Sequence, residues 1–173
     1  HPRYISEAFD YREDGYFQTD LIQKKQDRIR IAKPNILNVR LYEETNGLIK
    51  HTFLENAQPI IEYPIKTQYK EGCVQVLEKP NKDEPEKFTY FGGVDPVATD
   101  ITTTSESLFA IYIWKTLTEK TYWDEKDEVV RKSIEGFKPV AWYVGRYDSL
   151  KETHKVAELL IRWYNAHTLV ESN

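Results

Sequence analysis

Short hydrophobic runs recur through the C-terminal half of the chain, and each has the length of a strand. The segments 88–94, 108–114 and 139–144 are rich in aromatic and β-branched residues, which is typical of buried strands in a sheet. Residues 118–123 either extend the same sheet or turn into the acidic stretch that follows. The pattern therefore predicts a sheet of at least three strands.

A change of hydrophobic period after these runs predicts a helix over about 150–164. Ser149 and Glu152 have the spacing of a capping box at its start, and Asn165-Ala166 ends it. The following segment, 167–171, again resembles a strand. A strand, a crossing helix and another strand form a crossover connection, which predicts a parallel pair of strands.

The N-terminal half is more polar, and prolines divide it into shorter pieces. Asn46-Gly47 is a dipeptide that favours a hairpin turn. Residues 1–35 are polar, and Thr19 to Pro34 has helical spacing with a basic run that is either a solvated face or a phosphate contact. Short strands are predicted at 36–42, 48–54, 59–63 and 74–77.

Composition narrows the class of protein. The chain has 173 residues, 40% of them apolar and 13% aromatic, which suits one folded domain with a small appendage. A single cysteine excludes a disulfide framework. No apolar run is long enough to span a membrane, and no signal peptide is visible, so an intracellular location is the default. The net charge of −4 argues against a pure nucleic-acid-binding module but leaves a metal-dependent nuclease open.

Two carboxylates stand out by their position. Asp95 ends the first predicted strand of the C-terminal half, and Glu171 ends the strand after the crossover helix. If those strands are parallel neighbours, both carboxylates emerge at the same edge of the sheet. Carboxylate oxygens close together suit Mg²⁺ or Mn²⁺. The alternative is structural, since Asp95 before Pro96 is also a good turn residue.

Several segments, taken in order, resemble the nuclease domain of the large terminase subunit of tailed bacteriophages. Residues 90–98 (YFGGVDPVA) resemble the strand that opens the RNase H-like fold of that family. Residues 143–146, the helix after them and 169–173 (LVESN) resemble its third strand, crossover helix and acid-bearing strand. Residues 4–9 resemble the segment that leaves the ATPase domain. No phosphate-binding glycine-rich loop occurs, so an ATPase motor cannot lie in these residues.

The resemblance implies an α/β fold, with an RNase H-like mixed sheet flanked by helices and an N-terminal helical and β-hairpin linker region. Residues 1–35 would be the linker or tail of a preceding ATPase domain. Residues 36–173 would be the nuclease domain, truncated at its C-terminus. The implied function is endonucleolytic cutting of concatemeric double-stranded DNA during packaging of the phage genome, in the host bacterial cytoplasm. The full-length protein would also bind the portal and the small terminase subunit, and no membrane is involved.

The resemblance also assigns roles to residues. Asp95 and Glu171 match the first and second catalytic acids, which would hold two divalent cations, Mg²⁺ or Mn²⁺. The family's third acid follows a further helix and would lie outside this chain. Candidate DNA contacts are Arg146, Lys151, Thr104 and Ser105, although an Arg–Asp pair, a solvated lysine and a plain polar loop are the structural alternatives.

Two other functions stay open at this point. One is another RNase H-like nuclease, such as a Holliday-junction resolvase, which would share the acids but need a basic DNA-binding face. The other is a non-catalytic docking or structural domain on an RNase H-like scaffold, which the missing third acid and the negative net charge favour.

Overall fold

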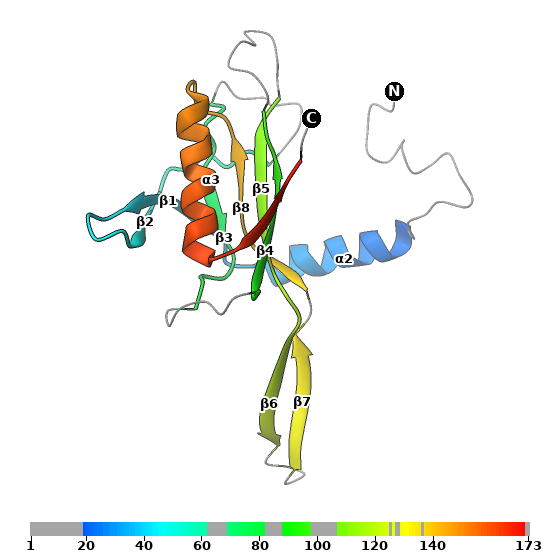
Figure 1. Ribbon diagram of the computed structural model, residues 1–173. Helices are drawn as coiled ribbons and strands as arrows, with labels where there is room; N and C mark the ends of the chain where they lie inside the picture. The colour runs from blue at the N-terminus through cyan, green and yellow to red at the C-terminus, as the bar shows by residue number, and fades with distance from the viewer. Residues whose placement is uncertain are drawn as a thin grey trace. The chain divides into compact units, whose positions relative to one another are not determined.

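The computed structural model (Figure 1) describes residues 19–61, 69–81, 88–97, 107–124, 126, 129–135 and 137–171. The chain divides into two compact units, residues 1–35 and residues 36–173. Among the described residues, no helix is long and apolar enough to cross a membrane.

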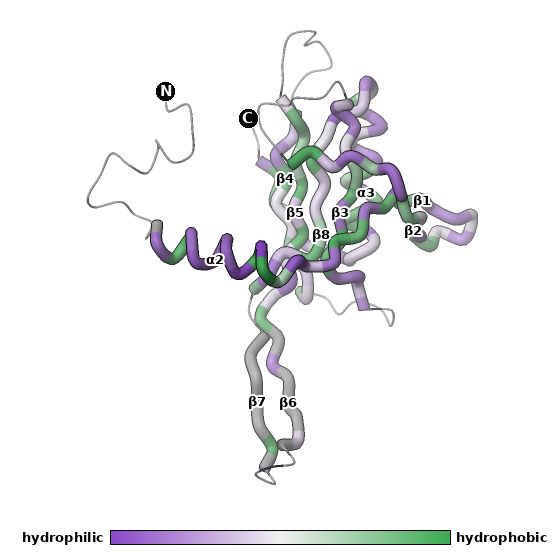
Figure 2. Tube along the Cα trace, turned by 180° about the vertical axis from the view of Figure 1, so that it is seen from behind, coloured by the Kyte–Doolittle hydropathy of each residue, from purple (hydrophilic) through white to green (hydrophobic). Residues whose placement is uncertain are grey.

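The first unit contributes one described helix, α2 (Thr19–Ala32). It ends because Lys33 takes a left-handed backbone conformation (φ 40°) and Pro34 follows. Its side chains from residue 20 onwards are exposed, as expected for a solvated basic helix. Figure 2 shows that α2 is mostly hydrophilic along its length.

The second unit is built on a seven-stranded mixed sheet in the order β2-β1-β3-β8-β5-β4-β9. Neighbouring strands are antiparallel except β4 and β9, which are parallel. The fold class is therefore α/β, as the sequence predicts. The strands of this sheet are β1 (Leu37–Glu43), β2 (Ile49–Phe53), β3 (Val74–Val76), β4 (Tyr90–Asp95), β5 (Phe109–Lys115), β8 (Lys138–Gly145) and β9 (His167–Val170).

A separate hairpin is inserted between β5 and β8. It consists of β6 (Thr118–Asp124) and β7 (Val129–Glu135), which pair with each other in a two-stranded sheet (Figure 1). Residues 118–123 thus belong to a strand, but to one of a separate hairpin and not of the large sheet. The sequence pattern does not predict β7.

Helix α3 (Leu150–Tyr164) covers one face of the large sheet and forms the core with it. Strands present alternate side chains to that face. Tyr90 and Val94 of β4 and Ile111 and Ile113 of β5 are buried there. From α3, Leu160 and Tyr164 are fully buried against them. Figure 2 shows hydrophobic residues recurring along β4 and β5.

A charged cluster lies beside the end of α3. The Glu78 carboxylate forms ion pairs with Lys115 and Lys138, with N–O distances of 2.5 and 2.7 Å. Partial burial raises the pKa of Glu78, but the hydrogen bonds from the two lysines outweigh it, so the pKa lies below its usual value. The hydroxyl of buried Tyr164 donates to the backbone carbonyl of Glu78, at 2.5 Å. These contacts tie the helix to the segment between β3 and β4.

Two local predictions are wrong. Of the strand predicted over 59–63, residues 59–61 are irregular, because Pro59 cannot donate to a ladder, and residues 62–63 lie outside the described residues. The expected capping box is also absent, because the Ser149 side chain makes no capping hydrogen bond. Thr153 instead links the start of α3 to the segment before it. Its hydroxyl accepts from the Tyr147 N–H (3.0 Å) and donates to the Ser149 carbonyl (3.3 Å).

Candidate functional site

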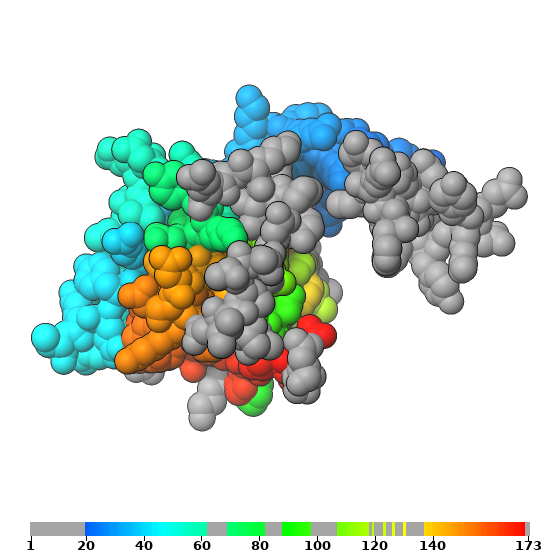
Figure 3. Space-filling model, turned by 90° about the horizontal axis from the view of Figure 1, so that it is seen from above, coloured from blue at the N-terminus to red at the C-terminus, as the bar shows by residue number. Residues whose placement is uncertain are grey.

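Parallel pairing of β4 with β9 brings Asp95 and Glu171 to the same end of the sheet. Gly93 pairs with Leu169 and Val94 pairs with Val170. One residue further along, the Glu171 N–H donates to the Val94 carbonyl at 3.0 Å. This confirms the predicted parallel pair. Figure 3 shows the red C-terminal residues beside the green residues of β4.

The strand pleat decides which face the acids occupy. Along β4, Tyr90, Gly92 and Val94 are buried towards α3, whereas Phe91, Gly93 and Asp95 are exposed. Asp95 therefore lies on the face opposite α3, which we call the open face. Since Gly93 pairs with Leu169, Glu171 falls on the open face as well.

An open hollow of about 480 Å³ lies beside the two acids and is lined by residues of β4 and β5 as well. Gly93 and Ala110 contribute small residues to its lining, and nothing lies within 4 Å of a Cβ placed on Gly93. Asp95 and Glu171 are both exposed beside it. The described residues that line it are Gly93, Val94, Asp95, Ala110, Tyr112, Trp114 and Glu171.

The donor set of this hollow suits a hard cation but is small. Both acids offer carboxylate oxygens, the ligands that Mg²⁺ and Mn²⁺ prefer. Among the described residues, no group of three or more His, Cys, Asp and Glu side chains could hold a metal ion. Two carboxylates would leave most positions of an octahedral ion to water or substrate.

The predicted DNA contacts have different outcomes. Arg146 follows β8, whose last residue Gly145 pairs with Phe109 at the start of β5. It therefore lies at the same end of the sheet as Asp95, half-buried, with its N–H donating to the Lys70 carbonyl (2.6 Å). Lys151 is exposed in the first turn of α3. Thr104 and Ser105 lie outside the described residues. Neither Arg146 nor Lys151 is among the described residues that line the hollow.

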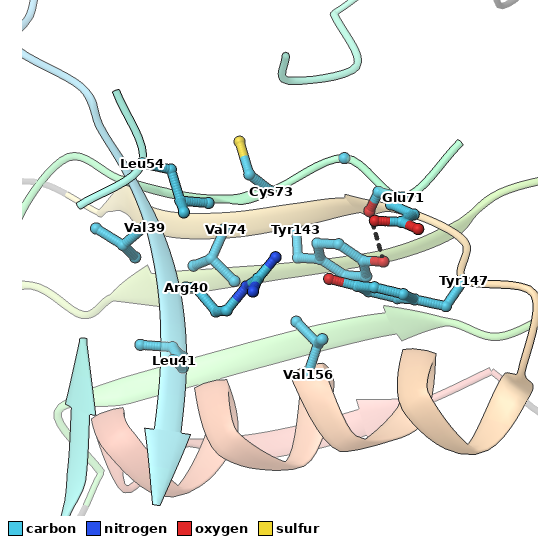
Figure 4. A pocket seen from close by; sticks show the side chains of 11 residues that line it. Val39, Arg40, Leu41, Leu54, Glu71, Cys73, Val74, Tyr143, Tyr147 and Val156 are labelled. Atoms are coloured by element: carbon cyan, nitrogen blue, oxygen red, sulfur yellow. Dashed lines mark hydrogen bonds between the residues drawn. The ribbon is translucent and has the colours of Figure 1, made fainter. Parts of the chain in front are cut away.

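A second cavity lies on the α3 side of the sheet, near β1 and β3 (Figure 4). Its volume of about 50 Å³ has room for a few water molecules at most. Tyr143 donates to the Glu71 carbonyl at its edge, at 2.9 Å. Burial raises the pKa of the Cys73 thiol to about 11, so this cysteine is not a reactive thiolate. The cavity belongs to the packing of the core.

Sequence reasoning missed the aromatic side chains that surround the acids. Trp142 is half-buried and pairs in register with Tyr112. Tyr112 is 42% exposed. The signal was present in β5, where Phe109, Ile111 and Ile113 alternate with Ala110, Tyr112 and Trp114. That alternation assigns the second set to the open face.

Comparison with known proteins identifies no relative. No family model matches the chain, and no curated protein and no solved structure matches it significantly.

Proposed function

We propose that residues 36–173 form a metal-dependent endonuclease domain with an RNase H-like fold, of the kind found in the large terminase subunits of tailed phages. Its substrate would be concatemeric double-stranded DNA during genome packaging. The observation that carries the proposal is the pairing of β4 with β9, which sets Asp95 and Glu171 side by side at the carboxyl ends of parallel strands.

The topology supports the same proposal. Strands β4, β5 and β8 form an antiparallel meander in the order of the chain, apart from the inserted hairpin. Helix α3 then crosses over to β9, which pairs in parallel with β4. This is the sequence of strand, third strand, crossover helix and acid-bearing strand that the resemblance implies.

In the proposed mechanism, Asp95 and Glu171 would hold the divalent cations. When bound, Mg²⁺ or Mn²⁺ would supply Lewis-acid activation of a water and charge stabilisation for the leaving oxygen of a phosphodiester. The chain itself contributes the two adjacent carboxylates. It also contributes the open hollow beside them, where small Gly93 and Ala110 leave space for the substrate.

The test is nicking of supercoiled plasmid in Mn²⁺ by the chain and by its Asp95→Asn variant. We expect the variant to lose cleavage while keeping the far-ultraviolet circular dichroism and the melting profile of the parent. Asp148→Asn is the matched control, since Asp148 is an exposed aspartate after β8 that does not line the hollow. Undiminished Mn²⁺-dependent nicking by Asp95→Asn would overturn the assignment.

One observation favours a second candidate, a non-catalytic docking domain on the same scaffold. The described residues bring together two acids rather than a set of three. Calorimetric titration with Mn²⁺ separates the two. A binding signal that disappears in Glu171→Ala supports the nuclease, and a flat titration of the parent chain supports the docking domain.

A further inference from the structure

The open face of the sheet carries aromatic rings that stay partly exposed among the described residues of the second unit. The one described helix of this unit, α3, packs on the other face. Phe91 is 38% exposed, Tyr112 42% and Leu169 84%. Two half-buried tryptophans, Trp114 and Trp142, accompany them.

These side chains form rows across the strands. Strand register sets Leu169, Gly93, Tyr112 and Trp142 next to one another on β9, β4, β5 and β8. The neighbouring row contains Asp95 and Ala110 as a direct pair. Tyr112 is thus the diagonal neighbour of Asp95, and such neighbours have side chains roughly 7–8 Å apart. That separation is of the order of the span between a phosphate and the base of its own nucleotide.

Tyr112 and Trp142, which we call the aromatic platform, are held in place. The Tyr112 and Trp142 rings are almost parallel (15°), with centroids 6.5 Å apart. Trp142 donates its indole N–H to the Gln75 side-chain oxygen at 2.8 Å, which fixes the orientation of the indole. Beside Tyr112, the missing side chain of Gly93 leaves the hollow open. A flat ring can therefore approach the exposed side of Tyr112 from the hollow that contains the acids.

The charge of the hollow argues against binding of duplex phosphates at this face. Among the residues that the structure describes, its lining includes two carboxylates and no lysine or arginine. Proteins that bind duplex backbones do so with lysine and arginine. Aromatic side chains on a sheet, in contrast, bind unpaired bases by stacking, with little regard to sequence.

We propose that the DNA strand enters this site unpaired, with a base beside the scissile phosphate stacked on Tyr112. The proposal rests on the proposed function for the identity of the substrate. It adds that, within the double-stranded substrate, the site acts on a single-stranded or locally opened stretch rather than on intact duplex. Tyr112 is a substrate-binding residue in this view, and Trp142 positions it.

The test measures binding in EDTA, where cleavage cannot occur, by fluorescence anisotropy of a labelled oligothymidylate. We expect Tyr112→Leu to weaken binding by about 5- to 150-fold, which is the effect of losing one stacking ring. Tyr112→Phe retains the ring and should bind like the parent. Tyr42→Ala is the matched control, because Tyr42 has the same 42% exposure but lies on β1, away from the acids.

The outcomes separate base stacking from the nuclease assignment. Equal binding by the parent and Tyr112→Leu, or equal binding of an intact duplex and a single strand by the parent, overturns base stacking. If Asp95-dependent nicking persists in that case, the nuclease assignment stands alone. If Tyr112-dependent binding is seen without any metal-dependent cleavage, the stacking surface stands and the nuclease assignment fails. Preferential cutting of a gapped duplex over an intact one supports both.

Discussion

Two adjacent glycines in β4 provide a sharp test of how the acid pair is held together. A Cβ placed on Gly92 would lie 2.6 Å from the Thr168 methyl carbon on β9 and 3.1 Å from the Ile113 terminal methyl. A Cβ placed on Gly93 meets nothing within 4 Å. The same substitution, glycine to alanine, is therefore crowded at one position and free at the next.

The magnitudes follow from this difference. Alanine in a strand interior is favoured over glycine by about 0.5–1 kcal/mol, and Gly93→Ala should gain this amount. Gly92→Ala gains the same but pays for overpacking, which costs about 1–3 kcal/mol. Thr168 is β-branched and short, so it cannot swing away. We expect the two variants to differ by about 1–3 kcal/mol in the free energy of unfolding, with Gly92→Ala the less stable.

Equilibrium unfolding in urea, monitored by circular dichroism, measures the difference. Thr168→Ser removes the methyl that a Cβ at Gly92 would meet. In the Thr168→Ser background, Gly92→Ala should therefore lower the free energy of unfolding much less than it does in the parent, and the difference between the two backgrounds measures this one contact. Equal stability of Gly92→Ala and Gly93→Ala, or a loss that Thr168→Ser does not relieve, would refute the pairing of β4 with β9 described above.

Four further variants test other contacts. Thr153→Val should destabilise the protein by about 1–2 kcal/mol because it removes two buried hydrogen bonds, whereas Ser149→Ala should be nearly neutral. If thermal melts show that Ser149→Ala is the more destabilising of the two, the Ser149 side chain caps the helix after all. Tyr164→Phe should cost about 1 kcal/mol in urea unfolding, since it leaves the Glu78 carbonyl without its buried donor. Glu78→Gln should remove part of the acid sensitivity of the fold. The lowered pKa of Glu78 gives stability that is present above its usual value of 4.5 and lost as pH falls through the folded value, so unfolding midpoints of the parent should fall more steeply below pH 4.5 than those of the variant.

Much of the fold follows from local pattern. The helix at 150–164 and the strands around 90–95, 109–115 and 138–145 are predicted because their hydrophobic periods are regular and they pack on one core. Strand β7 (VVRKSIE) is not predicted, because Arg131, Lys132 and Ser133 interrupt its apolar residues; among the described strands it pairs with β6.

The candidate site divides in the same way. The meeting of Asp95 with Glu171 is predictable because a crossover helix enforces a parallel pair. The aromatic platform is not, because Trp142 and Tyr112 become neighbours only through the register between β5 and β8, including its shift after Ile113. Register is a long-range property, and a one-residue slip would move every side chain to the opposite face.

The parallel pairing of β4 with β9 also has a kinetic consequence. Between these two strands in the chain lie β5, the hairpin, β8 and α3. Closing so long a loop is entropically costly, so contacts of high sequence separation form slowly unless the intervening structure is already in place. We therefore expect β9 to join the sheet after the β4–β5–β8 meander and α3 have condensed. Asp95 and Glu171 would then come together in the last stage of folding, so that partly folded chains lack the paired acids.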